Sequence, residues 1–540
     1  MGRFFKDGFQ LFPEQVELAK GLSSRRRAIL IDSTGNGKTL VCLYSYSYLK
    51  SKGLADCLLV LTPKNAYDKR VWAKDAAAHT HLTSISLDDF IKKVSGGADV
   101  LELLNSYDVV YGKHTHCKTD YGVLRQIYMS SCKLVTVLDE VHAFKNSKAQ
   151  LTSTMSLLVK NCYALWGVTA TVLSKNCMDT YHLVNFVYPR FFTSVRGFQS
   201  QFCKIEEKII GRNPDMTLRK ARIITDYKDS AALMDYLRPV MIVGTPPVPL
   251  DIHFIDYTMS DYEQDLYAKV AQGLMLSGES DDATWIQQVL SRSEIREGAV
   301  RSVKDLERHS SRFIYLQAVT DGCLNPDGTF GVGGSRKLDS LLTLVSDIAS
   351  RNESVLVYFD FYSSLDAAMY HLQRSGITDS RGRSIVVVES SSRNVLKSTQ
   401  ATESQCFMNS YVILCTRAAS ESANYTYINN VVLFDVPVTP IPFLQFIGRI
   451  TRKTSKFLGD LHLWIFRSDD ISEYKLQLVG FKVYMQEKIS FEIHNFPREY
   501  VKPMSDAEHL RVAKKHLLWK DRRPRLIRSS QIVPQGGTLF

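Results

Sequence analysis

The sequence lacks the features that mark secreted and membrane-spanning proteins. No apolar run approaches the roughly 20 residues that cross a bilayer, and residues 1–10 carry charge and contain no apolar signal core. The ten cysteines are scattered, without a Cys-x-x-Cys pair that would suggest a zinc or redox site. We therefore expect a soluble intracellular protein with mostly buried thiols, located in the cytoplasm or nucleoid, or in the host cytoplasm if its source is viral.

Internal repeats and low-complexity tracts are also missing. The 540 residues are 45% hydrophobic and 23% charged, which is the ordinary globular range and is enough for two or more cored domains. The formal net charge of +11 is compatible with a polyanionic partner, because neutralised phosphates release condensed counterions. Charge alone does not distinguish nucleic-acid binding from an ordinary basic surface.

Short β-branched or aliphatic runs recur in both halves of the chain, and each is followed by a polar or glycine-containing turn. This pattern predicts parallel α/β sheets. In the first half the predicted strands are residues 28–31, 57–61, 108–111 and 134–138. In the second half they are residues 354–359, 384–388, 411–415, 430–434 and 461–465. Because the ligand crevice of such sheets lies at the carboxyl ends of the strands, motifs that follow the strands are site candidates.

Composition divides the chain into four regions. Residues 1–190 form the first β/α region, and residues 191–334 are richer in charge and helical spacing, which predicts a largely helical insertion and connection. Turn residues at 325–334 precede the second β/α region, residues 335–480. Residues 481–540 form a basic C-terminal extension, either a solvated tail or a DNA-contacting one.

A phosphate-binding loop is predicted directly after the first strand. The segment reads Asp32-Ser33-Thr34-Gly35-Asn36-Gly37-Lys38-Thr39, and a helix-compatible run follows. Its glycines let backbone N–H groups close around phosphates, Lys38 reaches the β- and γ-phosphate oxygens, and Thr39 can bind Mg²⁺. The alternative is a chance match in a loop. The preceding strand and the following helix favour an ATP-binding loop that runs from Ser33 to Thr39.

An acidic pair, Asp139-Glu140, ends the aliphatic run at residues 134–138 and is followed by Val141-His142. One carboxylate can hold Mg²⁺ while the next polarises the attacking water, which is the division of work that phosphoryl transfer requires. We assign Asp139 to the metal and Glu140 to the catalytic base. Taken alone, the tetrapeptide would be read as a capped turn with exposed acids.

Two further segments are candidates for coupling the nucleotide state to the other half of the protein. They are His142 and the run Thr169-Ala170-Thr171, which follows the aliphatic residues 165–168. Structural packing is the alternative for both segments.

In their order along the chain, these segments resemble the Swi/Snf-type DNA translocases of helicase superfamily two, up to about residue 480. The segment Leu11-Phe12-Pro13-Glu14-Gln15 is similar to the opening motif whose glutamine reads adenine. Thr62-Pro63, with Lys64, resembles the first DNA-contacting loop. Residues 139–146, which include Lys145-Asn146, resemble the family's DEAH box followed by a Lys-Asn pair.

The resemblance continues in the second half. Cys415-Thr416-Arg417 begins a stretch like the family's Ser-Thr-Arg-Ala-Gly-Gly, and it implies DNA contacts by Thr416 and Arg417. Residues 445–452 match Gln-x-x-Gly-Arg-x-x-Arg, with Gln445 as a coupling residue. Arg449 and Arg452 lie three residues apart on one helix face and are arginine-finger candidates. The catalytic candidates are these two arginines, Lys38 and Glu140. A surface ion pair is the alternative for either arginine.

The resemblance implies two RecA-like lobes with a helical insertion between them, ATP and Mg²⁺ as cofactors, and movement on duplex or branched DNA without sequence preference. Three departures concern the coupling to DNA: Asp32 and Ala170 stand at small or glycine positions, the glycines after Arg417 are missing, and Ile242-Val243-Gly244 replaces paired arginines. The alternative function is a non-catalytic or weakly catalytic DNA-binding regulator. An RNA-directed helicase is a third reading, which the segment around Lys145-Asn146 disfavours.

Overall fold

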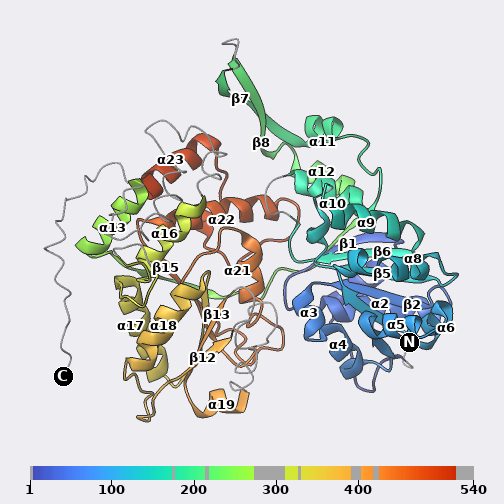
Figure 1. Ribbon diagram of the computed structural model, residues 1–540, viewed down its shortest axis with the longest axis horizontal. Helices are drawn as coiled ribbons and strands as arrows, with labels where there is room; N and C mark the ends of the chain where they lie inside the picture. Colours follow the sequence, from blue (N-terminus) through green and yellow to red (C-terminus); the bar gives the residue numbers. More distant parts are fainter. Residues whose placement is uncertain are drawn as a thin grey trace.

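The chain folds into two α/β lobes that lie side by side in the computed structural model (Figure 1). The structure describes residues 4–146, 148–172, 177–212, 218–272, 310–325, 330–390, 403–416 and 425–518. Arg417, the missing-glycine segment that follows it and the basic stretch after residue 518 lie outside these residues. In the part of the chain that is described, no helix is long and apolar enough to cross a membrane.

The N-terminal lobe contains a seven-stranded sheet with the order β3-β4-β2-β5-β6-β1-β9, in which every pairing is parallel. Its strands are β1 (Arg27–Ile31), β2 (Cys57–Thr62), β3 (Ser84–Ser86), β4 (Val109–Lys113), β5 (Leu134–Asp139), β6 (Ala164–Thr169) and β9 (Met241–Val243). The four strands predicted for the first half are confirmed. Their aliphatic residues are buried because helices cover both faces of a parallel sheet.

Helices surround this sheet and connect its strands. They are α1 (Pro13–Ser23), α2 (Lys38–Ser51), α3 (Lys64–Asp68), α4 (Val71–His79), α5 (Leu87–Ser95), α6 (Val100–Ser106), α7 (His116–Thr119), α8 (Tyr121–Met129), α9 (Gln150–Leu158), α10 (Met178–Val187), α11 (Val195–Phe202) and α12 (Ser230–Leu237). Short 3-10 turns follow β5 (Val141–Phe144) and α9 (Val159–Asn161).

The C-terminal lobe contains a six-stranded parallel sheet with the order β10-β15-β14-β11-β13-β12. Its strands are β10 (Asp251–Asp256), β11 (Val355–Phe359), β12 (Val386–Ser390), β13 (Tyr411–Thr416), β14 (Asn430–Leu433) and β15 (His462–Arg467). All five strands predicted for the second half are confirmed. The helices are α13 (Asp261–Gln272), α16 (Ser310–Thr320), α17 (Arg336–Ser350), α18 (Tyr362–Arg374), α19 (Glu403–Met408), α21 (Pro440–Ile447), α22 (Ile471–Glu487) and α23 (Asp506–Leu518).

The sheets divide the chain differently from the expected boundaries at residues 190 and 334. Strand β9 pairs with β1 and completes the first sheet, whereas β10 pairs with β15 in the second sheet. The chain therefore passes between the lobes between Val243 and Asp251. The expected helical insertion also contains a two-stranded antiparallel ribbon, β7 (Cys203–Arg212) and β8 (Leu218–Tyr227), which projects from the N-terminal lobe (Figure 1).

The expectation of mostly buried thiols is confirmed. All ten cysteines are free, and all except Cys132 and Cys162 are buried. Their role is therefore packing in the core, where free cysteine behaves as a small hydrophobic residue.

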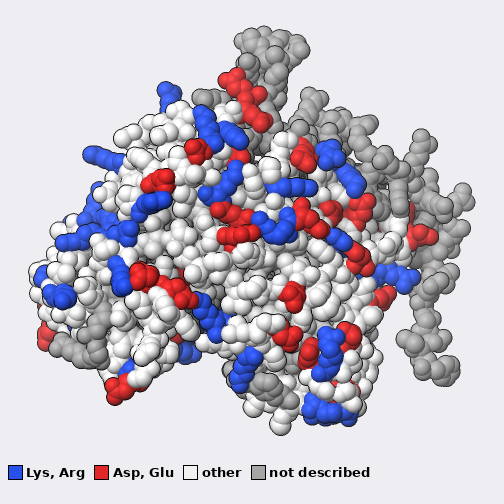
Figure 2. Space-filling view, turned by 180° about the vertical axis from the view of Figure 1, so that it is seen from behind, with Lys and Arg blue, Asp and Glu red and all other residues white. Residues whose placement is uncertain are grey.

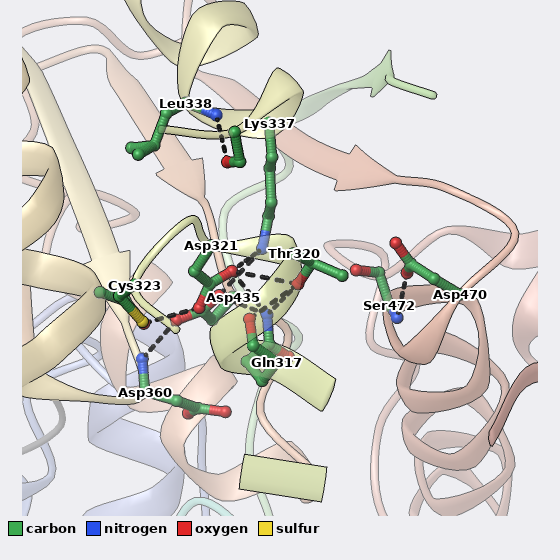
Figure 3. A network of polar contacts seen from close by, with 12 residues as sticks. Gln317, Thr320, Asp321, Cys323, Lys337, Leu338, Asp360, Asp435, Asp470 and Ser472 are labelled. Atoms are coloured by element: carbon green, nitrogen blue, oxygen red, sulfur yellow. Dashed lines mark hydrogen bonds and ion pairs between the residues drawn. The ribbon is translucent and has the colours of Figure 1, made fainter. Parts of the chain in front are cut away.

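A fully buried ion-pair network organises the C-terminal lobe (Figure 3). The Nζ of Lys337 lies 2.7 Å from an Oδ of Asp321 and 3.0 Å from an Oδ of Asp435. Gln317 donates to the same two carboxylates, at 2.8 and 2.9 Å. The other oxygen of Asp321 accepts from Ser364 at 2.6 Å. The network therefore ties α16, α17 and α18 to the loop that follows β14.

Burial raises the pKa of Asp321 to about 7, and the charge of Asp435 adds to the rise, against the opposing effect of Lys337. Burial alone would lower the pKa of Lys337, but the two aspartates outweigh it and the pKa is raised. Lys337 therefore supplies the positive charge that stabilises two buried carboxylates.

Substituting Lys337 with methionine should strongly destabilise the protein, because two buried carboxylates would lose their counter-charge. We expect a loss of about 3–5 kcal/mol in the free energy of unfolding of the C-terminal lobe, measured by urea denaturation. Lys20→Met is the matched control, since the Lys20 side chain is 68% exposed in its ion pair with Glu17, and it should change little. Equal stability of the two variants would contradict this role for Lys337.

Candidate nucleotide site between the two lobes

The phosphate loop lies between β1 and α2, at the carboxyl edge of the first sheet. Gly35 and Gly37 have φ angles of +91° and +82°, a region that favours glycine. A Cβ atom added at Gly37 would lie 2.5 Å from the Nε2 of Gln15. The backbone of the loop is therefore curled in the way that lets successive N–H groups surround an anion.

Lys38, the first residue of α2, folds over this loop. Its Nζ donates to the backbone oxygens of Asp32 and Ser33, at 2.9 and 2.8 Å. These bonds hold the ammonium group against the backbone of the phosphate loop, where its charge is available to a bound polyanion.

Asp32 stands where the family has a small residue. Its side chain hydrogen-bonds the phosphate loop to the segment that connects the lobes. One of its carboxylate oxygens accepts from the backbone N–H of Ser33, the side chain of Asn36 and the backbone N–H of Thr245, at 2.9, 2.9 and 3.2 Å. Burial raises the pKa of Asp32, against the opposing effects of Lys38 and these hydrogen bonds. The absence of a side chain at Gly244 makes space for the Asp32 carboxylate, because an added Cβ atom there would lie 2.3 Å from this oxygen.

Gln15 contacts the other side of the loop. Its Nε2 donates to the backbone oxygen of Asn36 at 2.7 Å, and its Oε1 accepts from the backbone N–H of Phe12 at 3.0 Å. The glutamine is 5% exposed, so it links the start of α1 rigidly to the phosphate loop.

Asp139 stands at the end of β5 and is held by three groups from neighbouring elements. Its Oδ2 accepts from the hydroxyl of Thr62 at 2.9 Å and from the indole N–H of Trp72 at 3.1 Å. Its backbone oxygen accepts from His114 at 2.8 Å. Burial raises the pKa of Asp139, and the adjacent Glu140 adds to the rise. Burial lowers the pKa of His114 to about 4, so this ring is neutral.

Glu140 has a left-handed backbone with φ +48°, which turns its side chain toward β6 and the second lobe. Its Oε2 lies 3.2 Å from the Nδ1 of His142 and 3.3 Å from the hydroxyl of Thr169. Burial raises the pKa of Glu140, but His142, Lys38 and Gln445 outweigh it and lower the pKa to about 2. The carboxylate is therefore ionised at neutral pH.

The proposed coupling residues form one cluster. The hydroxyl of Thr169 lies 3.1 Å from His142 and also accepts from the backbone N–H of Thr171, at 3.1 Å. The next residue, Val172, donates its backbone N–H to the side chain of Gln486 on α22, at 3.1 Å. The cluster therefore connects the acidic pair to the second lobe.

The second lobe brings the end of α21 against this site. Gln445 donates to the Oε1 of Glu140 at 3.4 Å, and the Nε of Arg449 donates to the backbone oxygen of Gln445 at 3.1 Å. A Cβ atom added at Gly448 would lie 2.5 Å from the side chain of Thr34. The cavity left between phosphate loop and α21 has a volume of about 10 Å³, roughly the space of one water molecule.

Arg452 lies directly over the phosphate loop. A Cβ atom added at Gly35 would be 3.0 Å from the Cγ of Arg452. The Nε of Arg452 is buried without a hydrogen-bond partner, and so is the hydroxyl of Thr34. Burial lowers the pKa of Arg452, against the opposing effect of Asp75, whose side chain is also hydrogen-bonded to Thr39. Buried donors left unpaired beside a curled loop suit an anionic ligand.

The residues proposed to contact DNA are dispersed. Thr62 is fully buried with its hydroxyl on Asp139, and Thr416 is 4% exposed. Lys64 and Asn146 are exposed, whereas Pro63 is half-buried. Lys145 is half-buried, with its Nζ 3.8 Å from Asp179. A role in binding DNA stays a prediction for all of them, and for Arg417.

Sequence reasoning missed the groups that hold the motifs in place. These are Trp72, Asp75, His114 and Thr245 around the site, and an ion pair between Glu14 and Lys453 that joins the lobes. The ammonium group of Lys453 also lies 5.4 Å from the ring centre of Phe12. Trp72, Asp75, His114, Thr245 and Lys453 lie outside the recognised motifs, which is why no sequence signal identified them.

Two parallel-sheet lobes, with a phosphate loop and acidic pair in one and an arginine pair in the other, define a helicase of superfamily two. The SNF2-related domain family matches residues 15–318, and the helicase conserved C-terminal domain matches residues 336–454. The chain belongs to the SNF2-related family, which confirms the resemblance inferred from the motifs.

The chain is similar to two named helicases and to one solved structure. The uncharacterised ATP-dependent helicase YqhH of Bacillus subtilis is 22% identical over 90% of this chain and 80% of its own length. The ATP-dependent DNA helicase DDM1 of Arabidopsis thaliana is 24% identical over 78% of this chain, which spans 54% of that protein. The Sulfolobus solfataricus SWI2/SNF2 ATPase core, solved in complex with dsDNA, aligns with 89% of this chain at 16% identity and a TM-score of 0.37.

Substituting Asp32 tests whether it braces the phosphate loop. Asp32→Ala should lower the free energy of unfolding by about 1–3 kcal/mol, because three donors lose their acceptor. Asp32→Asn keeps an acceptor oxygen and removes a buried charge, so it should stay within about 1 kcal/mol of the wild type. Thermal denaturation of the two variants measures the difference. If Asp32→Ala were as stable as Asp32→Asn, Asp32 would not stabilise the phosphate loop in this way.

Proposed function

We propose that the protein is a DNA-stimulated ATPase that translocates on duplex or branched DNA without sequence preference. The observation that carries the proposal is the convergence of both lobes on one site. Lys38 and Glu140 come from the first lobe, and Gln445 and Arg452 come from the second. A site divided in this way is complete only when the lobes meet, which is what coupling of hydrolysis to movement requires.

ATP with Mg²⁺ is the cofactor that this donor set suits. Ser33 to Thr39 would surround the phosphates, Gln15 would lie beside the adenine, and Thr39 and Asp139 would hold the metal. When bound, Mg²⁺ neutralises charge on the β- and γ-phosphates. Glu140 would orient and polarise the attacking water, and Lys38, Arg449 and Arg452 would stabilise the charge that develops on the transferred phosphoryl group.

The tight contact between α21 and the phosphate loop supports a cycle of lobe separation and closure. Gly448 packs directly against Thr34 of the phosphate loop. Nucleotide entry would therefore move Gly448 away from Thr34, and hydrolysis would let the lobes regain this contact. The cluster of His142, Thr169 and Thr171, which reaches Gln486, would transmit the change between the lobes.

DNA is the track that the relatives suggest, since DDM1 is named a DNA helicase. The net charge of +11 favours a polyanion. Cationic and acidic side chains are interspersed over the face drawn in Figure 2, so that face offers phosphates scattered contacts rather than one broad basic patch. Contacts to the phosphate backbone would position the protein without reading sequence.

The test is steady-state ATP hydrolysis with and without duplex DNA. We expect duplex DNA to stimulate the wild type, and Lys38→Ala to abolish both the basal and the stimulated rate. Lys20→Ala is a control, because Lys20 is exposed on α1, where it pairs with Glu17. Hydrolysis that DNA does not stimulate, or that survives Lys38→Ala, would refute the proposal. Nucleotide binding without any turnover in the wild type would favour the non-catalytic regulator.

A further inference from the structure

A pocket lies at the amino end of β1, whereas the phosphate loop follows the carboxyl end of the same strand. The volume of the pocket is about 290 Å³. Its lining comes from three places in the sequence, which are Arg25, Arg26 and Arg27 at the start of β1, Tyr188 and Phe191 after α10, and Pro239 and Val240 before β9. Because the whole strand separates the pocket from the phosphate loop, it is not part of the nucleotide site.

The apolar side of the pocket belongs to a row of aromatic rings that solvent reaches. Tyr188 is 46% exposed, and Tyr236 on α12 is 47% exposed. The ring of Phe191 lies between them, with its centroid 5.8 Å from that of Tyr188 and 5.1 Å from that of Tyr236. Both contacts are edge-to-face, so the rings form one connected surface. Adjoining exposed aromatic residues that are rimmed by polar groups mark an interaction site.

The cationic side of the pocket consists of three consecutive arginines that backbone carbonyl groups hold in place. Arg25 donates three hydrogen bonds to oxygens at the carboxyl ends of α1 and α12, at 3.1, 2.8 and 3.3 Å. Arg27 donates two to oxygens at the carboxyl ends of α9 and α10, at 2.9 and 3.0 Å. Arg26 donates to the backbone oxygen of Tyr163 at 3.2 Å, and its guanidinium group lies 3.5 Å from the centre of that ring.

Capping of helix ends explains how the arginines are held, but it leaves their charge largely unbalanced. The carboxyl end of a helix carries only a partial negative charge. Among the residues that the structure describes, none of the three arginines is paired with an acidic side chain. Asp235, which precedes Tyr236, is itself paired with Arg238 at 2.8 Å. A guanidinium group has five N–H donors, so N–H groups remain for a ligand.

We propose that this arginine–tyrosine pocket binds an acidic segment of a partner protein, with an aromatic or aliphatic side chain as the anchor of that segment. The guanidinium fork matches the geometry of a carboxylate, and the aromatic rings offer an apolar surface to the anchor. Tyrosine and arginine are also enriched among the residues that dominate the binding energy of protein interfaces. Because the protein already fixes the guanidinium groups, little side-chain freedom is lost on binding.

The two-sided lining favours a peptide over a nucleic acid. A duplex presents phosphates to the arginines, but its backbone has no apolar group that would cover the rings of Tyr188 and Phe191. A single strand requires a cationic groove that follows several nucleotides, whereas the cations here gather on one side of a single pocket. The inference goes beyond the proposed function, since it needs neither ATP hydrolysis nor DNA binding.

Fluorescence anisotropy of labelled hexapeptides with the full chain tests the pocket. The probes are Asp-Glu-Phe-Asp-Glu-Asp and the same peptide with Leu as the anchor. One matched peptide has Asn and Gln in place of every acid, and another has Ala in place of Phe. We expect saturable binding of the acidic probes below about 1 mM. Each matched peptide should bind about tenfold more weakly than the Phe probe, because it lacks either the carboxylates or the anchor.

The variants change two exposed side chains of the pocket and keep the two arginines that hold helix ends. Arg26→Gln and Tyr188→Ser should each weaken binding of the acidic probes about fivefold or more. Arg26→Lys keeps the charge but loses the fork, so its affinity should lie between those of Arg26→Gln and the wild type. Arg336→Gln and Tyr121→Ser are matched controls, which change a 63% exposed arginine side chain on α17 and a 38% exposed tyrosine on α8. Both should bind the probes as the wild type does.

Weaker peptide binding by both pocket variants, with unchanged controls, would support the inference. A melting temperature within a few degrees of the wild type verifies that each variant is folded. The inference would be overturned if the wild type bound neither acidic probe, or if both pocket variants bound them with wild-type affinity. Peptide binding that fails while the pocket variants lose affinity for an oligonucleotide would also overturn it and would assign the pocket to nucleic acid. Stimulation of ATP hydrolysis by DNA is measured separately, so either proposal can fail alone.

Discussion

The contact between the end of α21 and the phosphate loop is the interaction on which the rest of the site depends. Gly448 lies against Thr34, and Arg452 lies against Gly35, so two glycines allow two backbones to approach closely. Larger residues at either position would hold the lobes apart. The same approach brings Gln445 to Glu140, across the boundary between the lobes. Close packing at one point therefore aligns groups that lie about 300 residues apart in the sequence.

Each half of the site is made rigid within its own lobe before the halves meet. In the first lobe, Asp139 is fixed by Thr62 and Trp72, and the phosphate loop is fixed by Asp32 and Gln15. In the second lobe, Asp435 precedes α21 and belongs to the buried network around Lys337 (Figure 3). Groups that are already positioned need little reorganisation when charge develops during phosphoryl transfer. Rigid halves that meet across one contact are compatible with the lobe movement of the proposed function.

Much of this could be predicted from the sequence. The sheet strands were found because aliphatic runs ending in turns identify buried parallel strands, and the site followed because Lys38 and Asp139 come directly after two of them. Strand β9 was missed because three residues are too short to give a pattern. The β7–β8 ribbon was missed because Glu206, Glu207 and Lys208 interrupt any alternation of apolar and polar residues. Trp72 and His114 could not be found, since only the fold brings them to Asp139.

The central claim is that both lobes supply the groups that hydrolyse ATP, and the most direct test is the turnover of Arg452→Ala at saturating ATP and duplex DNA. An arginine that stabilises the transition state accounts for roughly 10³-fold or more in rate. The account predicts a loss of that size with ATP affinity changed by less than about tenfold, since Lys38 and the phosphate loop stay intact. Turnover within a few-fold of the wild type would contradict a site shared between the lobes.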